Sequence, residues 1–191
     1  FTGDAIAHLS MDDRFSLCNM AIEAGAKNGI IAVDEVTKEY LKDKKLRDEP
    51  KYFYSDDDAN YIKTIEIDVS KLSPIVAYPF LPENGKSIET AVSDDIAIDQ
   101  VFIGSCTNGR LEDIRIAAEI LKGKKVAKRV RLIITPATQK IALQAQKLGY
   151  IETLINAGAV VSNPTCGACL GAVSYTHLGA HETGRNLVCR L

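Results

Sequence analysis

The stretch VFIGSCTNGR (residues 101–110) passes from an apolar run into small polar residues around one cysteine. The later stretch VVSNPTCGAC (residues 160–169) has the same design, with two cysteines in its polar part. Short apolar runs bounded by turn residues are typical of buried strands. Each stretch therefore predicts a strand that leads into a turn carrying thiol groups.

Strand and helix patterns alternate around these two stretches. Apolar residues at helical spacing predict a helix over 111–121, which Gly123 ends. A strand is predicted over 130–134, followed by a helix that Thr135 caps and Pro136 opens. A short helix between two glycines and a last strand over 159–161 complete the pattern. This order indicates parallel strands joined by helices, so an α/β protein with layered αβα domains and mainly parallel sheets.

The first part of the chain gives weaker patterns. Ser10 is predicted to cap a helix running to about Lys27, and Asp34 to cap a second helix. Strands are predicted over 30–33, from its apolar residues, and over 61–69, from its period-two alternation.

Pro74, Pro79 and Pro82, with the turn pair Asn84-Gly85, mark a break in these patterns. The predicted division is an α/β domain over 1–84, a second α/β domain over 85–172 and a tail over 173–191.

Composition narrows the classes of function. The 191 residues are 46% hydrophobic and 25% charged, as is ordinary for a globular protein, and the formal charge is −2. That charge gives no electrostatic case for binding nucleic acid or an anionic membrane. No apolar run approaches the roughly 20 residues of a membrane span, so we expect a cytoplasmic protein.

Three cysteines are predicted to converge. Ligands of parallel α/β sheets bind beyond the carboxyl ends of the strands, which places Cys106, Cys166 and Cys169 at one edge if their strands are close neighbours. Thiolates select soft metals. An iron-sulfur cluster with three protein ligands and one open iron accounts for all three thiols.

Two alternatives stay open beside the cluster. Structural zinc uses four ligands, and the remaining candidates are poor: we interpret His8 as a surface residue and Cys18 as an inert thiol on an apolar helical stripe with Phe15 and Ile22. A thioredoxin-like pair formed by the Cys-x-x-Cys spacing leaves Cys106 without a role.

Three motifs carry a family resemblance: GSCTN (104–108), NPTCGACLG (163–171) and CNMAIEAGA (18–26). Together they resemble the signatures of the aconitase family of iron-sulfur hydro-lyases. The resemblance implies a 4Fe-4S cluster held by Cys106, Cys166 and Cys169. It also implies that Asn19 lies against the cluster and that Glu23 is an active-site carboxylate, whereas spacing alone favours solvent-facing roles for both.

The resemblance implies dehydration and rehydration of a malate-type acid. The first candidate substrate is 2-isopropylmalate, with citrate, homocitrate and dimethylmalate as alternatives. In this type of enzyme a separate small swivelling subunit carries the serine base and substrate arginines, so the expected partner forms a heterodimer or heterotetramer with this chain.

The sequence departs from the family pattern at both ends. The chain opens with Phe1, and the family's aspartate and histidine segment is absent before it, so we expect a fragment that is inactive alone. After Gly171 the family's asparagine and arginine segment does not follow. Residues 173–191 instead resemble translated adapter DNA, so we interpret His177, His181 and Cys189 as part of a non-native tail that packs on nothing.

Overall fold

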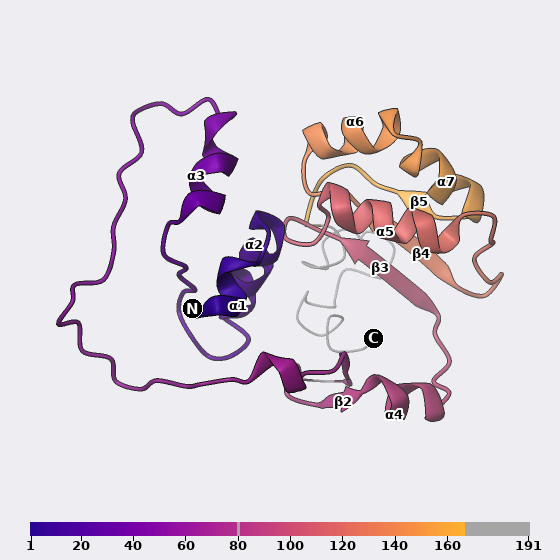
Figure 1. The fold of residues 1–191 in the computed structure, drawn as a ribbon. Coiled ribbons are helices and arrows are strands. Elements are labelled where there is room, and N and C mark those ends of the chain that lie inside the picture. The colour runs from indigo at the N-terminus through magenta and orange to yellow at the C-terminus, as the bar shows by residue number, and fades with distance from the viewer. Residues whose placement is uncertain (80, 167–191) are drawn as a thin grey trace, which may run out of the picture. The chain divides into compact units, whose positions relative to one another are not determined.

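The computed structural model describes residues 1–79 and 81–166, and its contacts divide the chain into two compact units, Phe1–Ser73 and Pro74–Leu191 (Figure 1). This division precedes the predicted one at 84/85. The reason is a hairpin, in which β1 (Ile75–Ala77) pairs antiparallel with β2 (Gly85–Ser87) and so joins residues on both sides of 84/85. Within the described ranges, every helix is too short or too polar to cross a membrane.

A parallel three-stranded sheet forms the centre of the second unit. Its strands are β3 (Gln100–Gly104), β4 (Arg131–Thr135) and β5 (Val160–Val161), in the order β3-β4-β5. Ile103 of β3 lies opposite Ile134 of β4, and Ile134 lies opposite Val161 of β5. The predicted strands and their parallel arrangement are therefore confirmed, and the protein is of the mixed α/β class.

Three helices pack on one another beside this sheet: α5 (Leu111–Leu121), α6 (Gln139–Lys147) and α7 (Tyr150–Ala157). The predicted cap of α6 is wrong. Thr138, and not Thr135, accepts a hydrogen bond from the Ile141 N–H at 3.2 Å. Thr135 is still part of β4, where its hydroxyl has another partner. Another helix, α4 (Ile88–Ser93), follows β2 and was not predicted.

The core of the second unit lies between the sheet and this helical layer. Ile114 of α5, Ile134 of β4 and Leu154 of α7 have no solvent exposure. Half-buried Val101 and Ile103 of β3 pack against the same cluster. Alternate residues of the strands thus face the helices, as the period of two in a strand requires.

The first unit is helical, with α1 (Asp4–Ala7), α2 (Met11–Met20), α3 (Glu35–Lys42) and the short 3₁₀ helix η1 (Val69–Lys71). Both predicted N-caps are confirmed. The Ser10 hydroxyl accepts from the Asp13 N–H and the Asp13 carboxylate accepts from the Ser10 N–H, which is a capping box. Asp34 accepts from the Thr37 N–H at the start of α3.

Helix α2 ends before the predicted Lys27. After Met20 the chain forms a turn in which Gly25 takes a positive φ of 81°. The Gly25 N–H donates to the Ile22 carbonyl, and the Ala26 N–H donates to the Ala21 carbonyl, both at 3.0 Å. This pair of bonds is a Schellman motif, so Gly25 closes the turn that follows α2 and prevents the helix from resuming toward the predicted end.

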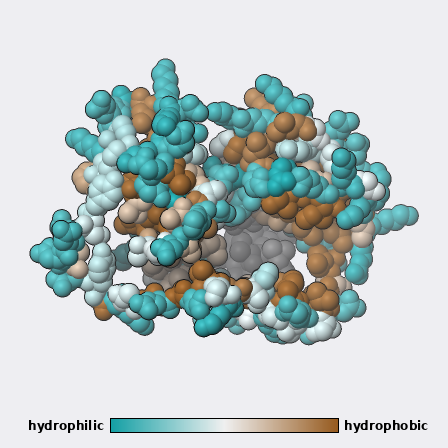
Figure 2. Space-filling view, in the orientation of Figure 1, coloured by the Kyte–Doolittle hydropathy of each residue, from teal (hydrophilic) through white to brown (hydrophobic). Residues whose placement is uncertain are grey.

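Both strands predicted in the first unit are wrong. Residues 30–33 and 61–68 form no strand, and Ile30, Ile65 and Ile67 are 70%, 69% and 66% exposed. A strand needs a hydrogen-bonded neighbour, and the described part of this unit contains no other strand to supply one. Large apolar side chains consequently stay on the surface, where Figure 2 shows brown patches.

Truncation of Leu154 tests the position of the core. We expect Leu154→Ala to lower the free energy of unfolding by about 2–5 kcal/mol, because it removes a fully buried side chain between helices and sheet. Leu143 of α6 is 58% exposed, so Leu143→Ala is the matched control and should change the free energy of unfolding by less than about 0.5 kcal/mol. Equal effects in urea denaturation would contradict the described core.

Candidate functional site

Two turns are attached to Thr135, the fully buried last residue of β4. The first turn follows β3, and its Ser105 N–H donates to the Thr135 carbonyl at 3.1 Å. The second segment follows β5. Its Ser162 hydroxyl lies 2.7 Å from the Thr135 hydroxyl, and the Ser162 N–H donates to the Ile134 carbonyl at 2.9 Å. The carboxyl end of β4 therefore holds both cysteine-bearing segments at one edge of the sheet.

Glycines allow the first turn to approach so closely. A Cβ atom on Gly104 would lie 2.0 Å from the Thr135 carbonyl oxygen, and one on Gly109 would lie 2.4 Å from the same atom. Gly104 also has a φ of +112°, which residues with side chains rarely adopt. The Ala137 N–H donates to the Gly109 carbonyl at 2.8 Å. The turn thus closes against β4 on both sides of Cys106.

The residue before Cys106 has a strained backbone. Ser105 has a φ of +111° although it is not glycine, and it is only 9% exposed. Such conformations cost of order 1–3 kcal/mol and are concentrated at functional sites. Hydrogen bonds hold the strained turn: the Gly109 N–H donates to the Ser105 carbonyl, and Arg110 Nε donates to the Thr107 carbonyl at 3.3 Å. The backbone that carries Cys106 is therefore fixed.

The described thiols are available to a ligand. Cys106 and Cys166 are both exposed, and Cys106 Sγ lies 3.7 Å from the Thr107 hydroxyl. Adjacent strands lie about 4.8 Å apart, so β3 and β5, on either side of β4, are about 10 Å apart. The predicted convergence of the cysteines assumed that their two strands are close neighbours. In the structure one strand, β4, separates β3 from β5.

The third predicted ligand, Cys169, lies outside the described residues, as do His177, His181 and Cys189. Among residues 1–79 and 81–166, no three His, Cys, Asp or Glu side chains form a group able to hold a metal ion. The three-cysteine site therefore stays a prediction. Its donor chemistry fits a soft metal centre, since the described edge offers exposed thiols flanked by uncharged Ser105, Thr107 and Thr165.

Asn19 and Glu23 belong to the first unit. Asn19 lies in the last turn of α2, Glu23 lies in the turn that Gly25 closes, and both are exposed. Their predicted roles stay predictions.

The apolar stripe predicted beside them is partly wrong. Phe15 and Cys18 are half-buried, with the Phe15 ring 5.6 Å from that of Tyr40, but Ile22 is 62% exposed because it follows the end of the helix. The buried residue of α2 is instead Arg14. His8 is exposed, as predicted.

Sequence reasoning missed Thr135, Ser105 and Ser162 as site residues. A signal was present, since each is a hydroxyl residue at or next to the carboxyl end of an apolar strand. Their contacts with one another join segments that are far apart along the chain, so no local pattern reveals them.

A parallel α/β sheet with thiols on the turns beyond its strands defines a candidate metal-cofactor protein. Residues 1–189 match the aconitase family (aconitate hydratase), and the chain belongs to that family. The match runs into the segment predicted to be a non-native tail, which the structure does not describe.

The chain is also similar to individual family members. It is 69% identical over 196 residues to the 3-isopropylmalate dehydratase large subunit of Campylobacter concisus, covering 100% of this chain and 46% of that relative. The large subunits of the same name from Campylobacter fetus and Aliarcobacter butzleri are both 66% identical, over 196 and 202 residues, with 46% and 47% of their lengths covered and 100% of this chain. The chain thus spans about half the length of these relatives.

A double-mutant cycle tests the junction at Thr135. We expect Thr135→Val, Ser162→Ala and the double variant to reveal a coupling of about 0.5–1.5 kcal/mol in the free energy of unfolding, because one partly buried hydrogen bond joins the two hydroxyls. Additive single effects, measured by urea denaturation, would show that the hydroxyls of Thr135 and Ser162 do not couple the end of β4 to the segment after β5.

A pair of glycine substitutions tests the close approach. Gly104→Ala should destabilise the chain by about 3 kcal/mol or more, because it adds a clash with the Thr135 carbonyl to an unfavourable φ. Gly123→Ala is the matched control: its φ is +72° but no atom lies within 4 Å, so only about 1–2 kcal/mol is expected. Similar losses in the free energy of unfolding at both positions would show that the turn after β3 does not pack tightly against Thr135.

Proposed function

We propose that this chain, in its full-length form, is the large subunit of a hydro-lyase that interconverts 2-isopropylmalate and 3-isopropylmalate by dehydration and rehydration in leucine biosynthesis. The similarity to 3-isopropylmalate dehydratase large subunits supports this choice of substrate. The observation that carries the proposal is the attachment of both cysteine-bearing segments to Thr135 at one sheet edge.

In this proposal Cys106, Cys166 and Cys169 hold a 4Fe-4S cluster. When bound, the cluster would supply Lewis-acid chemistry toward the oxygen atoms of the substrate, through an iron that lacks a cysteine ligand. The chain supplies the fixed placement of the thiols. Gly104 and Gly109 allow the turn after β3 to pack against β4. The positive φ of Ser105 sets the direction in which the backbone enters Cys106.

Glu23 and Asn19 have the remaining roles assigned to this chain. The Glu23 side chain accepts a proton at the substrate hydroxyl oxygen as a carboxylate or donates one there as a carboxylic acid, and its exposure leaves it accessible to a ligand. Asn19, four residues earlier in the last turn of α2, offers an uncharged amide that donates and accepts hydrogen bonds and orients the bound groups.

The proposed partner is a separate small subunit, as the large-subunit names of the relatives imply. It completes the site with the base and further substrate-binding groups. We place the protein in the cytoplasm, whose reducing conditions keep cysteine thiols free for metal binding.

Anaerobic iron-sulfide reconstitution of the full-length protein tests the ligand set. We expect about four irons and four sulfides per chain, and loss of most of them in Cys106→Ser, Cys166→Ser and Cys169→Ser, because each removes one thiolate ligand. Cys18→Ser is the matched control and should keep the full content, since that thiol is half-buried in the first unit. A protein that binds only zinc would contradict the cluster.

Activity of the same preparation, combined with its small subunit, tests the substrate. We expect hydration and dehydration of 2-isopropylmalate and its 3-isomer. Turnover of citrate, homocitrate or dimethylmalate alone would keep the reaction class and overturn the proposed substrate.

A further inference from the structure

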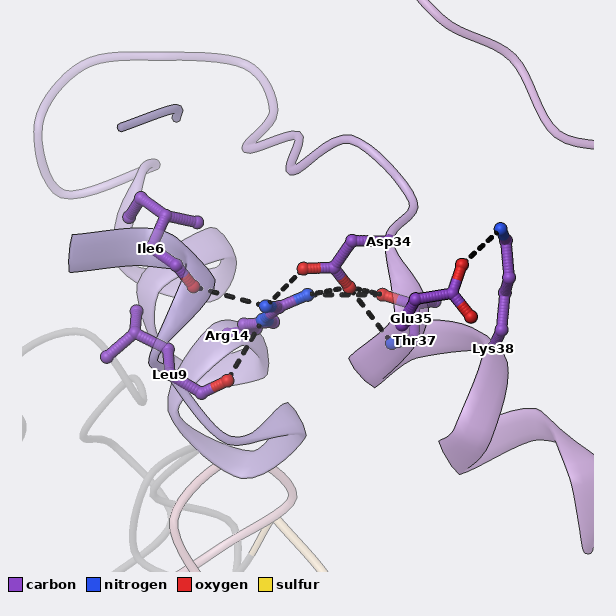
Figure 3. Close-up of polar contacts among 7 residues, drawn as sticks. All are labelled: Ile6, Leu9, Arg14, Asp34, Glu35, Thr37 and Lys38. Atoms are coloured by element: carbon purple, nitrogen blue, oxygen red, sulfur yellow. Dashed lines mark hydrogen bonds and ion pairs between the residues drawn. The ribbon is translucent and has the colours of Figure 1, made fainter. Parts of the chain in front are cut away.

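Arg14 is the most deeply buried charged residue of the first unit among those described, with 3% of its surface exposed. Its guanidinium group forms a bidentate pair with Asp34, at 2.6 Å from Nη1 to Oδ1 and 2.7 Å from Nη2 to Oδ2 (Figure 3). The planar group matches the carboxylate in two places, a geometry that lysine cannot reproduce.

The same guanidinium group also binds backbone carbonyls. Nε donates to the Leu9 carbonyl and Nη2 donates to the Ile6 carbonyl, both at 3.1 Å (Figure 3). Asp34 in turn accepts from the Thr37 N–H as the N-cap of α3. One side chain of α2 therefore connects the end of α1 with the start of α3.

The pair stays charged at neutral pH. The hydrogen bond from Arg14 holds the pKa of the Asp34 carboxyl well below its usual range, and the same bond raises the pKa of Arg14. Only the Arg14 side of the pair is buried, since the Asp34 side chain is 38% exposed. Such an ion pair is weak evidence for stability, because apolar side chains of similar size stabilise as well. The pair therefore provides a fixed geometry in addition to any stability.

Arg14 and Asp34 lie directly before and after the segment 15–33, which carries Asn19 and Glu23, and their ion pair joins its two ends. Two further features hold this segment within itself. Gly25 closes the turn after α2, and Gly29 packs so tightly on α2 that a Cβ atom would lie 2.6 Å from the Cys18 Cα. The segment is thus fixed at its ends by the ion pair and along its length by two glycines.

We infer that Arg14 and Asp34 are positioning residues, which hold the segment 15–33 so that Asn19 and Glu23 keep their places toward the substrate. The inference rests on the proposed function for the roles of Asn19 and Glu23. Displacements of about 1 Å at reacting groups cost roughly 100-fold in rate. A looser segment should therefore affect turnover more than folding.

The experiment uses the full-length protein with its cluster and small subunit, and compares Arg14→Lys, Asp34→Asn and the double variant Arg14→Met/Asp34→Asn. The double variant removes both charges and keeps an N-cap amide at position 34. Arg115→Lys is the matched control, because Arg115 likewise forms ion pairs through its guanidinium group, but with two carboxylates, Glu112 and Glu119, that are exposed on α5.

We expect kcat for 2-isopropylmalate to fall about 10- to 100-fold in all three variants, with amide hydrogen exchange accelerated over 15–33. In the double variant the thermal midpoint should return toward that of the wild type while kcat stays low. A purely structural role predicts that kcat recovers with the midpoint, and that result would overturn the inference, as would loss of folding in all three variants.

Hydrogen exchange separates this inference from the proposed function. If the wild type turns over none of the offered acids, the proposed function fails. The inference fails separately if hydrogen exchange over 15–33 is the same in the variants as in the wild type, because the ion pair then does not hold this segment. The Arg115→Lys control should match the wild type in both kcat and exchange.

Discussion

Pairing of β3 and β5 with the same strand is the constraint on which the candidate site depends. Because both lie parallel to β4, their carboxyl ends reach the same edge of the sheet, although Cys106 and Cys166 are far apart along the chain. Thr135 completes this arrangement, with its carbonyl bound to the turn after β3 and its hydroxyl bound to the segment after β5.

The two compact units are held by different interactions. The second unit has an apolar core between sheet and helices, centred on fully buried Ile114, Ile134 and Leu154. The first unit instead buries a guanidinium group, and hydrogen bonds from Arg14 join three helices. Apolar contact tolerates small shifts in direction, whereas a bidentate ion pair fixes direction. This difference agrees with a first unit that presents Asn19 and Glu23 on a fixed segment.

The sequence predicted the second unit well because its periodicity coincides with burial. The predicted helix over 111–121 is α5, and the predicted strands match β3, β4 and β5 closely. In the first unit the alternation over 61–69 predicted a strand, but an alternating pattern becomes a strand only where a neighbour supplies hydrogen bonds. The early end of α2 at Met20 also went unrecognised, since the predicted helix continued past Gly25 to about Lys27.

The candidate site was predictable in part for a related reason. The position of Cys106 and Cys166 just beyond apolar strands is a local pattern, and so is the resemblance carried by their motifs. Their common attachment to Thr135, the strain at Ser105 and the pairing of Arg14 with Asp34 depend on contacts between distant segments. Those contacts follow from the tertiary fold and leave no periodic trace.

A crystal structure of the anaerobically prepared full-length protein, with anomalous diffraction recorded at the iron edge, tests the central claim most directly. The account predicts one compact iron peak beyond the carboxyl ends of β3 and β5, in bonding contact with the sulfur atoms of Cys106, Cys166 and Cys169. An iron peak away from Cys106, or a peak at the zinc edge in its place, would contradict it.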